Sequence, residues 1–473
     1  MIAKGHHALR MVEETEFKEL IKMVSHCPNY QLPSRKKLSE NLLVKTHQQI
    51  AEELQIKINN AQAVCLTTDA WTSRANESYI AVTAHIDEHS KLCSSTLGCI
   101  QYNERHSAEN MFNFLKNIMK EWQISHKIAA VVSDNAPNIL LTVKMGNWTS
   151  VGCFAHSLNL VVQKSKRTIL DTLAKVKSIV EYFKRSTQGL RKLQDAQRQM
   201  KLPLLKLKQE VSTRWNSSFE MLDRILKIKD AIITTTALLR NDLSMQQDDW
   251  DIIEEVIPLL QPFYEVTTEL SKTSSDNPKV DALLDVLKEE MRSRFQNIEN
   301  NEVYAECTIL DPRFRNRGFT NVESYEKALQ GLRNKLAVVS LPEVNQENDP
   351  NITNINVTVS EDRSQQKSIW DDYDEETIKI IRPENKQMAG IIELDKYLTE
   401  DYLDRKNDPL EWWDQRKKIY PNLYSLILNR FCVVATSVPC ERIFSGTGQI
   451  LNDRRTLLKS AKVSKLIFLH TNM

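Results

Sequence analysis

Glycine is scarce in this sequence, with 10 residues among 473. This scarcity disfavours barrels, propellers and glycine-rich phosphate loops, because tight turns and close backbone approaches need glycine. Eight cysteines are spread along the chain, and no two of them form a CxxC pair. A disulfide framework is therefore not expected, and a reducing, intracellular compartment is the default for such a chain.

Long apolar runs are also missing. No run reaches membrane length, and the first residues, MIAKGHH, are polar and unlike a signal peptide. We therefore expect no association with a membrane. The 473 residues are enough for two or more domains, and 41% hydrophobic with 26% charged residues is ordinary for a globular protein.

The formal net charge of +1 conceals a separation of charge along the chain. Residues 164–208 contain thirteen Lys and Arg against three Asp and Glu, a net charge of +10. Residues 343–376 contain ten acids against two bases, a net charge of −8. The basic stretch fits either a solvated helix face or a surface that binds nucleic acid.

Strand-like segments are confined to the first third of the chain. Short runs rich in Val, Ile, Thr and Cys occupy residues 63–68, 79–86, 92–100, 128–133 and 151–154. The first three have connections short enough for antiparallel neighbours, and the fourth is of the buried parallel type. Helical spacing dominates from residue 11 to residue 60, over 107–122 and after residue 160. The pattern predicts an α/β fold, a mixed sheet with helices packed on it.

Two of these strands end on an aspartate, Asp69 and Asp134. Taken singly, each aspartate also suits a turn or helix cap. At the carboxyl ends of two strands in one sheet, the pair could share a proton or bind Mg²⁺ or Mn²⁺. A two-ion site for phosphodiester chemistry needs about three carboxylates. Glu441, near a helix start after Pro439, is the best third candidate, although an ordinary first-turn acid would occupy the same place.

Six segments occur in a fixed order: CLTTDAWTS, AAVVSDNAPNI, CFAHSLNLVV, STRWNSSFEML, Trp412-Trp413 and SVPCERIFSGTG. From about Leu32 to its end, the chain resembles the hAT superfamily of DNA transposases, in particular the branch with domesticated BED-finger proteins. The resemblance implies a ribonuclease-H-like mixed sheet interrupted by a large all-helical insertion, with a C-terminal dimerisation region. It also implies that Asp69, Asp134 and Glu441 are the catalytic, metal-binding acids, with Mg²⁺ or Mn²⁺ as cofactor.

The same resemblance implies contacts with DNA. His156, in the CFAH segment, is expected near DNA and not as a metal ligand; alone, CFAH suggests a buried cysteine and a helix-start histidine. Arg214 and Trp215 match an RW motif in which arginine holds phosphate and tryptophan stacks on a flipped base. A core tryptophan is the alternative for Trp215. In the basic stretch we expect Lys184 and Arg185 to contact the DNA backbone.

The end of the chain is strongly apolar for a terminus, where fraying is the usual expectation. Such a surface is covered by the protein's own core or by a partner. The resemblance points to a partner, a homodimer or higher homo-oligomer. The residues expected in that interface are Trp412, Trp413, Leu458, Val463, Leu466 and Ile467.

The resulting division of the chain has four parts. They are a helical N-terminal segment (1–62), the first part of the ribonuclease-H-like domain (63–185), a helical insertion with a disordered stretch near 341–368 (186–390), and C-terminal helices with the dimerisation region (391–473). The N-terminal part has one cysteine, Cys27, and no paired-cysteine zinc pattern, so we expect no BED finger within this chain.

Two functions remain open from the sequence. The first is a nuclear DNA transposase, or a protein derived from one, that cleaves and joins DNA strands with an Asp-Asp-Glu site. The second is a domesticated, non-catalytic nuclear protein that binds DNA, regulates transcription and dimerises through its C-terminal region. The three acids favour the first function, and the lack of a finger favours the second.

Overall fold

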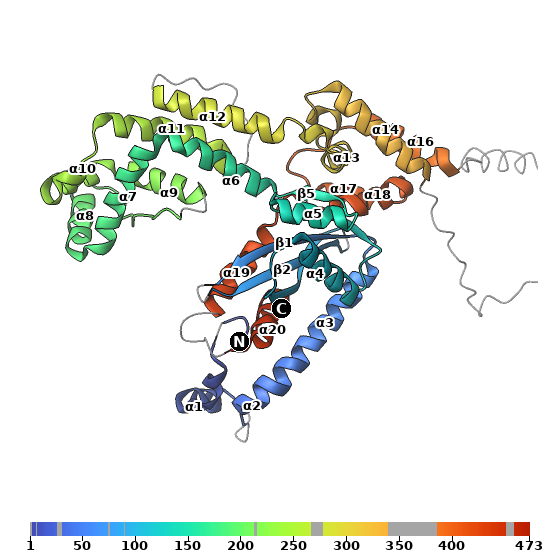
Figure 1. The fold of residues 1–473 in the computed structure, drawn as a ribbon, viewed down its shortest axis with the longest axis horizontal. Helices are drawn as coiled ribbons and strands as arrows, with labels where there is room; N and C mark the ends of the chain where they lie inside the picture. The colour runs from blue at the N-terminus through green and yellow to red at the C-terminus, as the bar shows by residue number, and fades with distance from the viewer. Residues whose placement is uncertain are drawn as a thin grey trace, which may run out of the picture.

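The computed structural model describes residues 2–5, 7–25, 31–73, 76–88, 90–211, 215–265, 278–338, 386–450 and 458–473. The stretch predicted to be disordered near 341–368 lies outside these residues. Figure 1 shows a central sheet, a group of helices extending from it along α6, and a second helical group beside the sheet.

The sheet has five strands in the order β3-β2-β1-β4-β5. Its strands are β1 (Val64–Thr72), β2 (Ser78–Asp87), β3 (Leu92–Gln101), β4 (Ile128–Ser133) and β5 (Ser150–Gly152). Strands β1, β2 and β3 are antiparallel neighbours, whereas β4 pairs parallel to β1 and β5 parallel to β4. The predicted mixed sheet is confirmed, because the β-branched runs and short connections of the sequence specify this pairing locally.

One face of the sheet is covered by helices close to it in sequence. Alternate strand residues, such as Leu66, Ile80 and Val131, form a buried cluster with the apolar sides of these helices. The helices are α3 (Leu43–Asn60), α4 (Ala108–Glu121) and α5 (Pro137–Met145). Before them lie η1 (Leu9–Glu13), α1 (Thr15–Val24), α2 (Arg35–Lys37) and η2 (Leu38–Leu42).

The other face is covered by segments from the far end of the chain. Helices α19 (Val438–Ile450) and α20 (Ser460–Asn472) pack near β2 and β3, where Tyr79, Ala81 and Cys99 lie in their cluster. Over β1, β4 and β5 the cover comes from Val303, Cys307 and Cys432. The sheet is therefore completed by residues more than 150 positions downstream in the chain.

The first helical group forms the largest buried cluster of the described residues. It contains α6 (Phe154–Ser165), η3 (Lys166–Ile169), α7 (Leu170–Arg185), α8 (Thr187–Gln199), α9 (Trp215–Leu226), α10 (Lys229–Leu239), η4 (Asn241–Leu243), α11 (Gln247–Glu265) and α12 (Pro278–Phe295). Its core begins at Leu158 and includes Val180 and Phe183 of α7. The packing therefore places the start of this group well before the expected boundary at residue 186, because α7 buries its apolar face against helices.

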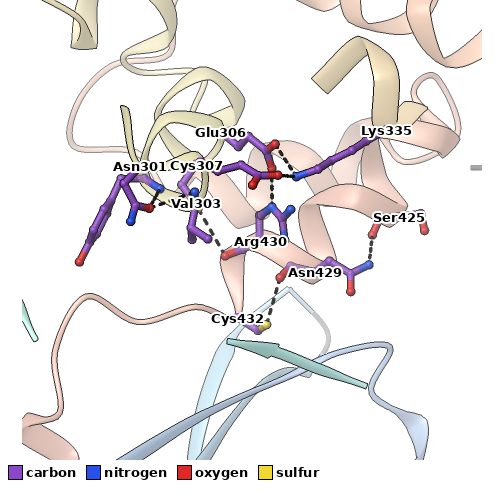
Figure 2. Close-up of polar contacts among 11 residues, drawn as sticks. Asn301, Val303, Glu306, Cys307, Lys335, Ser425, Asn429, Arg430 and Cys432 are labelled. Atoms are coloured by element: carbon purple, nitrogen blue, oxygen red, sulfur yellow. Dashed lines mark hydrogen bonds and ion pairs between the residues drawn. The ribbon is translucent and has the colours of Figure 1, made fainter. Parts of the chain in front are cut away.

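The second helical group crosses the other expected boundary, at residue 391. It comprises η5 (Ile298–Asn300), α13 (Glu302–Leu310), η6 (Arg315–Gly318), α14 (Val322–Val338), α16 (Lys386–Thr399), α17 (Pro409–Arg416) and α18 (Pro421–Phe431). Figure 2 shows the ion pairs that join its two ends: buried Glu306 accepts from Arg430 at 2.6 Å and from Lys335 at 2.6 Å. This carboxylate holds α13, α14 and α18 together.

Candidate active site

Asp69 and Asp134 lie at the same level of the sheet. Strand β4 ends just before Asp134 as expected, but β1 does not end on Asp69, because it continues to Thr72 through its pairing with β2. Thr67 of β1 pairs with Val132 of the parallel strand β4, and each aspartate comes two residues later on its strand path. Because strand side chains alternate between faces, Asp69 shares the face of Thr67. That is the face covered by α19. Asp134 directly follows the last residue of β4 and accepts a hydrogen bond from the Ala136 amide at 3.3 Å. The sheet therefore brings together two of the three predicted acids.

Helix α19 brings Glu441 to the same edge. Its Cys440, which is fully buried, lies with its Sγ 3.5 Å from the Thr67 carbonyl oxygen and 3.8 Å from that of Ala81. One turn on, Phe444 stacks on Trp71 with ring centroids 5.8 Å apart. These contacts fix the first turn of α19 on either side of Asp69, and Glu441 lies in that turn.

The three acids interact through their charges. The pKa of Asp69 is raised to about 7, chiefly by burial and in smaller part by the charges of Asp134 and Glu441, and a hydrogen bond from the Ala70 amide at 2.8 Å opposes the rise. Asp69 is therefore only partly ionised at neutral pH. It is the carboxylate whose charge interacts with both of the others, so the structure brings the predicted triad to one edge of the sheet.

The donor set suits a hard cation in kind, because carboxylate oxygens are what Mg²⁺ and Mn²⁺ prefer. Within the described ranges, however, no group of three His, Cys, Asp or Glu side chains is arranged to hold a metal ion. The acids are thus near enough to repel one another but do not form a closed set of ligands.

Cys153 ties the strands to the helix that carries Glu441. Its amide donates to the Ser133 carbonyl at 2.7 Å, and its buried Sγ accepts from the amides of His156 at 3.4 Å and Ser437 at 3.3 Å. The sequence predicted a buried cysteine here but not this bridge.

His156 lies in the first turn of α6, partly exposed, and its neighbour Ser157 accepts a hydrogen bond from Asn135 at 2.9 Å. Asn135 directly follows Asp134, so this histidine is close in the fold to the acidic edge. Its expected proximity to DNA stays a prediction.

Trp215 does not lie where a base could stack on it. Its side chain is only 5% exposed and packs edge-to-face against Phe219 and Phe263 in the core of the first helical group. The expectation of base stacking was wrong for this conformation, because Trp215 fills a helical core, the alternative the sequence had left open. Arg214 lies outside the described residues.

The basic stretch 164–208 is less positive in three dimensions than in sequence. Lys184 and Arg185 are exposed, but Arg185 pairs with Glu181 and Lys184 donates to Gln209 at 3.3 Å. Seven of its thirteen bases pair with a carboxylate, four of these carboxylates coming from outside the stretch: Glu210, Glu220, Asp249 and Glu290. Much of its charge is therefore used to hold helices together.

The residues expected in a dimer interface pack within their own chain. Val463, Leu466 and Ile467 are buried against the sheet, with Leu458 beside them. Trp412 and Trp413 lie in the core of the second helical group, where the Trp413 indole donates to the Leu310 carbonyl at 2.9 Å. Within one chain these apolar side chains are therefore covered by the protein's own core, and their expected place in a dimer interface stays a prediction.

Comparison with known proteins agrees with this architecture. Residues 67–145 match the ZBED1 RNase-like domain, residues 151–259 the ZBED1 RNase-like helical domain, and residues 393–473 the hAT family C-terminal dimerisation region. The start of the helical match at residue 151 agrees with the packing of α6 and α7.

Similar full-length proteins include both transposases and BED-finger proteins. The chain is 26% identical to zinc finger BED domain-containing protein 4 of Homo sapiens, over 100% of this chain and 43% of that protein. It is 25% identical to the putative AC transposase of Zea mays, over 98% of this chain and 63% of that protein. The chain thus spans about half the length of these curated relatives. No helix in the described part of the chain is long and apolar enough to cross a membrane.

Proposed function

Because this chain belongs to the hAT superfamily of DNA transposases and their BED-finger relatives, we propose that it cleaves and transfers DNA strands at a metal-dependent site formed by Asp69, Asp134 and Glu441. The observation that carries the proposal is the packing of α19 beside Asp69, where Cys440 contacts the Thr67 carbonyl and Phe444 stacks on Trp71. The charges of Asp134 and Glu441, which raise the pKa of Asp69, agree with it. Bound Mg²⁺ or Mn²⁺ would supply an activated attacking oxygen and stabilise the leaving oxygen.

The residues of the chain hold the acids ready for that cation. Cys440 fixes α19 on β1, and Cys153 fixes the segment before α19 to the end of β4. Asp69 has to release its proton before it can ligate a cation, so cation affinity rises with pH up to about 7, the pKa of this group, and then levels. Because the substrate is DNA, we expect the protein in the nucleus.

Self-association accompanies this function, since the chain contains a match to the hAT dimerisation region over residues 393–473. The apolar side chains of that region already fill the monomer core. The dimer contact is therefore formed by other, exposed parts of the region or by exchange of helices between two chains. A homodimer is the expected state at low micromolar concentration.

A cleavage assay on end-containing and branched DNA with Mg²⁺ or Mn²⁺ tests the proposal. Asp69→Asn, Asp134→Asn and Glu441→Gln should each abolish metal-dependent cleavage. Glu121→Gln, at an exposed position on α4, is the matched control and should cleave as wild type does. Cleavage that survives all three site substitutions would refute the assignment.

The alternative is a non-catalytic DNA-binding regulatory protein. One observation that favours it is that, among the residues that the structure describes, the three acids do not form a closed set of metal ligands. A second is the similarity to a protein named putative transcriptional regulator tpeD, which is 23% identical over 97% of this chain. In that case DNA binding would persist and no cleavage would be seen under any metal condition.

A further inference from the structure

A cavity of about 460 Å³ opens between α6, η3, α7 and α12, away from the acidic edge. Its lining is unusual in composition: five cationic side chains surround leucines, and a single carboxylate, that of Glu210, is present. The residues are Leu160, Gln163, Lys164, Lys166, Arg167, Leu170, Leu173, Lys177, Glu210 and Arg294. Its volume is in the range of small-ligand sites.

The base of this cavity is a rigid ionic network. Lys166 is buried, and its Nζ donates to Glu210 at 2.6 Å and to Ser218 at 2.6 Å. Lys177 pairs with the other oxygen of Glu210. Burial opposes ionisation, but hydrogen bonds from Lys166, Lys177 and Ser218 outweigh it and lower the pKa of Glu210 to about 2. Glu210 therefore stays charged and fixes both lysines at the base of the cavity.

The rim of the cavity remains positive after internal pairing. Glu290 neutralises part of the rim by pairing with Lys164 and with Arg294 at 3.2 Å. Over the whole cavity, base and rim together, five cations against the carboxylates of Glu210 and Glu290 leave a net charge of +3. Arg167 is exposed and forms no ion pair among the contacts of the described residues. Its guanidinium is thus available for the bidentate contact that arginine makes with phosphate.

The wall of the cavity is apolar and open to solvent. Leu170 is 54% exposed at the start of α7, and Leu160 is partly exposed on α6. A helix face that contacts only water has no need of an exposed leucine beside four exposed cations. A ligand that presents both an anionic group and an apolar or aromatic face matches the two surfaces together.

We propose that this cavity binds an unpaired nucleotide of a DNA strand. Its phosphate lies against Arg167 and Lys164, and its sugar and base lie against Leu160 and Leu170. Unstacked bases are held in proteins by stacking and apolar contacts, and phosphates by arginine and lysine. Duplex DNA presents its phosphates but not its base faces, so it would use only the cationic rim.

The position of the cavity relates it to the acidic edge. Helix α6 begins at Phe154, whose amide donates to the Ala435 carbonyl beside the candidate active site. The helix runs outwards from the sheet (Figure 1), and Lys164 near its end lines the cavity. At 1.5 Å per residue, Lys164 lies about 15 Å along α6 from Phe154. A strand spanning that distance would extend a few nucleotides beyond the scissile bond. The inference rests on the proposed function for its substrate, DNA, but not on cleavage.

The experiment measures binding of a fluorescein-labelled, unstructured single strand of about 12 nucleotides, and of a duplex of equal length, by fluorescence anisotropy. Arg167→Glu should weaken single-strand binding about tenfold and lower the log–log salt slope by about 0.7 for each phosphate that the variant no longer neutralises. Leu170→Ser should weaken binding of the single strand about threefold and leave the duplex unchanged, because the leucine faces only an unstacked base.

Arg191→Glu is the matched control, since Arg191 is an exposed base of the same stretch, on α8, outside the cavity. It should change affinity less than twofold. Equal losses for Arg167→Glu and Arg191→Glu, equal losses of single strand and duplex for Leu170→Ser, or no single-strand binding at all would overturn the proposal. If the protein cleaves DNA in the presence of metal but Arg167→Glu and Leu170→Ser leave single-strand binding unchanged, only the cavity proposal is rejected. Cavity-dependent binding without cleavage would reject the proposed catalytic function alone.

Discussion

Replacing Asp69 by asparagine should stabilise the protein at neutral and alkaline pH while destroying cation binding. The pKa of Asp69 is raised from 3.8 to about 7, chiefly by burial. A folded-state pKa above the unfolded value means that the folded protein binds a proton more tightly. Wild type therefore loses stability as pH rises from about 4 to about 7, and the loss is complete above that range. Asparagine carries no charge at any pH and avoids this loss.

The size of the effect follows from the shift. About three pKa units at 1.36 kcal/mol each set a ceiling of about 4 kcal/mol. Asp69 is partly exposed at the edge of the sheet, where water screens the charge, so about 2 kcal/mol is the expected gain at pH 8. Near pH 3 the two proteins should differ little, because most of the wild-type carboxyl group is then protonated in both the folded and the unfolded state.

The assay is denaturant unfolding at a series of pH values, with and without Mg²⁺. Tryptophan fluorescence is a suitable signal because Trp71 lies two residues from Asp69 and stacks on Phe444. Mg²⁺ should raise the free energy of unfolding of wild type at pH 8, by about 2.7 kcal/mol at a hundredfold excess over Kd, and should not affect Asp69→Asn.

Glu121→Gln serves as the control for removing one exposed carboxylate and should show neither effect. The reasoning would be refuted by an Asp69→Asn protein that is less stable than wild type at pH 8, or by a stability difference that does not grow with pH. Either result would mean that the folded protein stabilises the ionised carboxylate of Asp69, and that burial does not destabilise it.

Four further predictions follow from the packing. Leu466→Ala should cost about 2–5 kcal/mol of unfolding free energy in denaturant melts, as a buried leucine of the monomer core does, and an unchanged midpoint would contradict its place in that core. Glu306→Ala should cost about 3–5 kcal/mol because two cations lose their buried partner, whereas Glu302→Ala, at an exposed pair with Lys335, should cost less than about 1 kcal/mol; equal costs would reject the buried network. Cys153→Val should lose the two amide hydrogen bonds to Sγ and weaken Mg²⁺ binding in calorimetric titrations, while Cys153→Ser should retain more of it; identical affinities would rule out a positioning role. Light scattering of the wild type should find a dimer at low micromolar concentration, and a well-folded monomer at tens of micromolar would contradict the self-association expected from the matched region.

The sequence by itself determined the strands of the sheet and the positions of Asp69 and Asp134 along two of them. Apolar alternation, short connections and a buried run ending at Asp134 are local properties, and parallel pairing of β1 with β4 then brings Asp69 and Asp134 to one edge. Glu441 could be placed beside them only through the resemblance to a family, because nothing local to α19 indicates what its first turn contacts.

The tertiary structure alone decided which apolar and charged groups are free. The sequence around Leu466 is equally compatible with burial in the protein's own core and with burial against a partner. The sequence around Trp215 is likewise compatible with a core position and with a surface that binds DNA. In the same way, the charge of the basic stretch could be counted from the sequence, but its neutralisation by Asp249 and Glu290 depends on partners far away along the chain. Burial and ion pairing are long-range contacts, set by how the helices pack, and local periodicity carries no information about them.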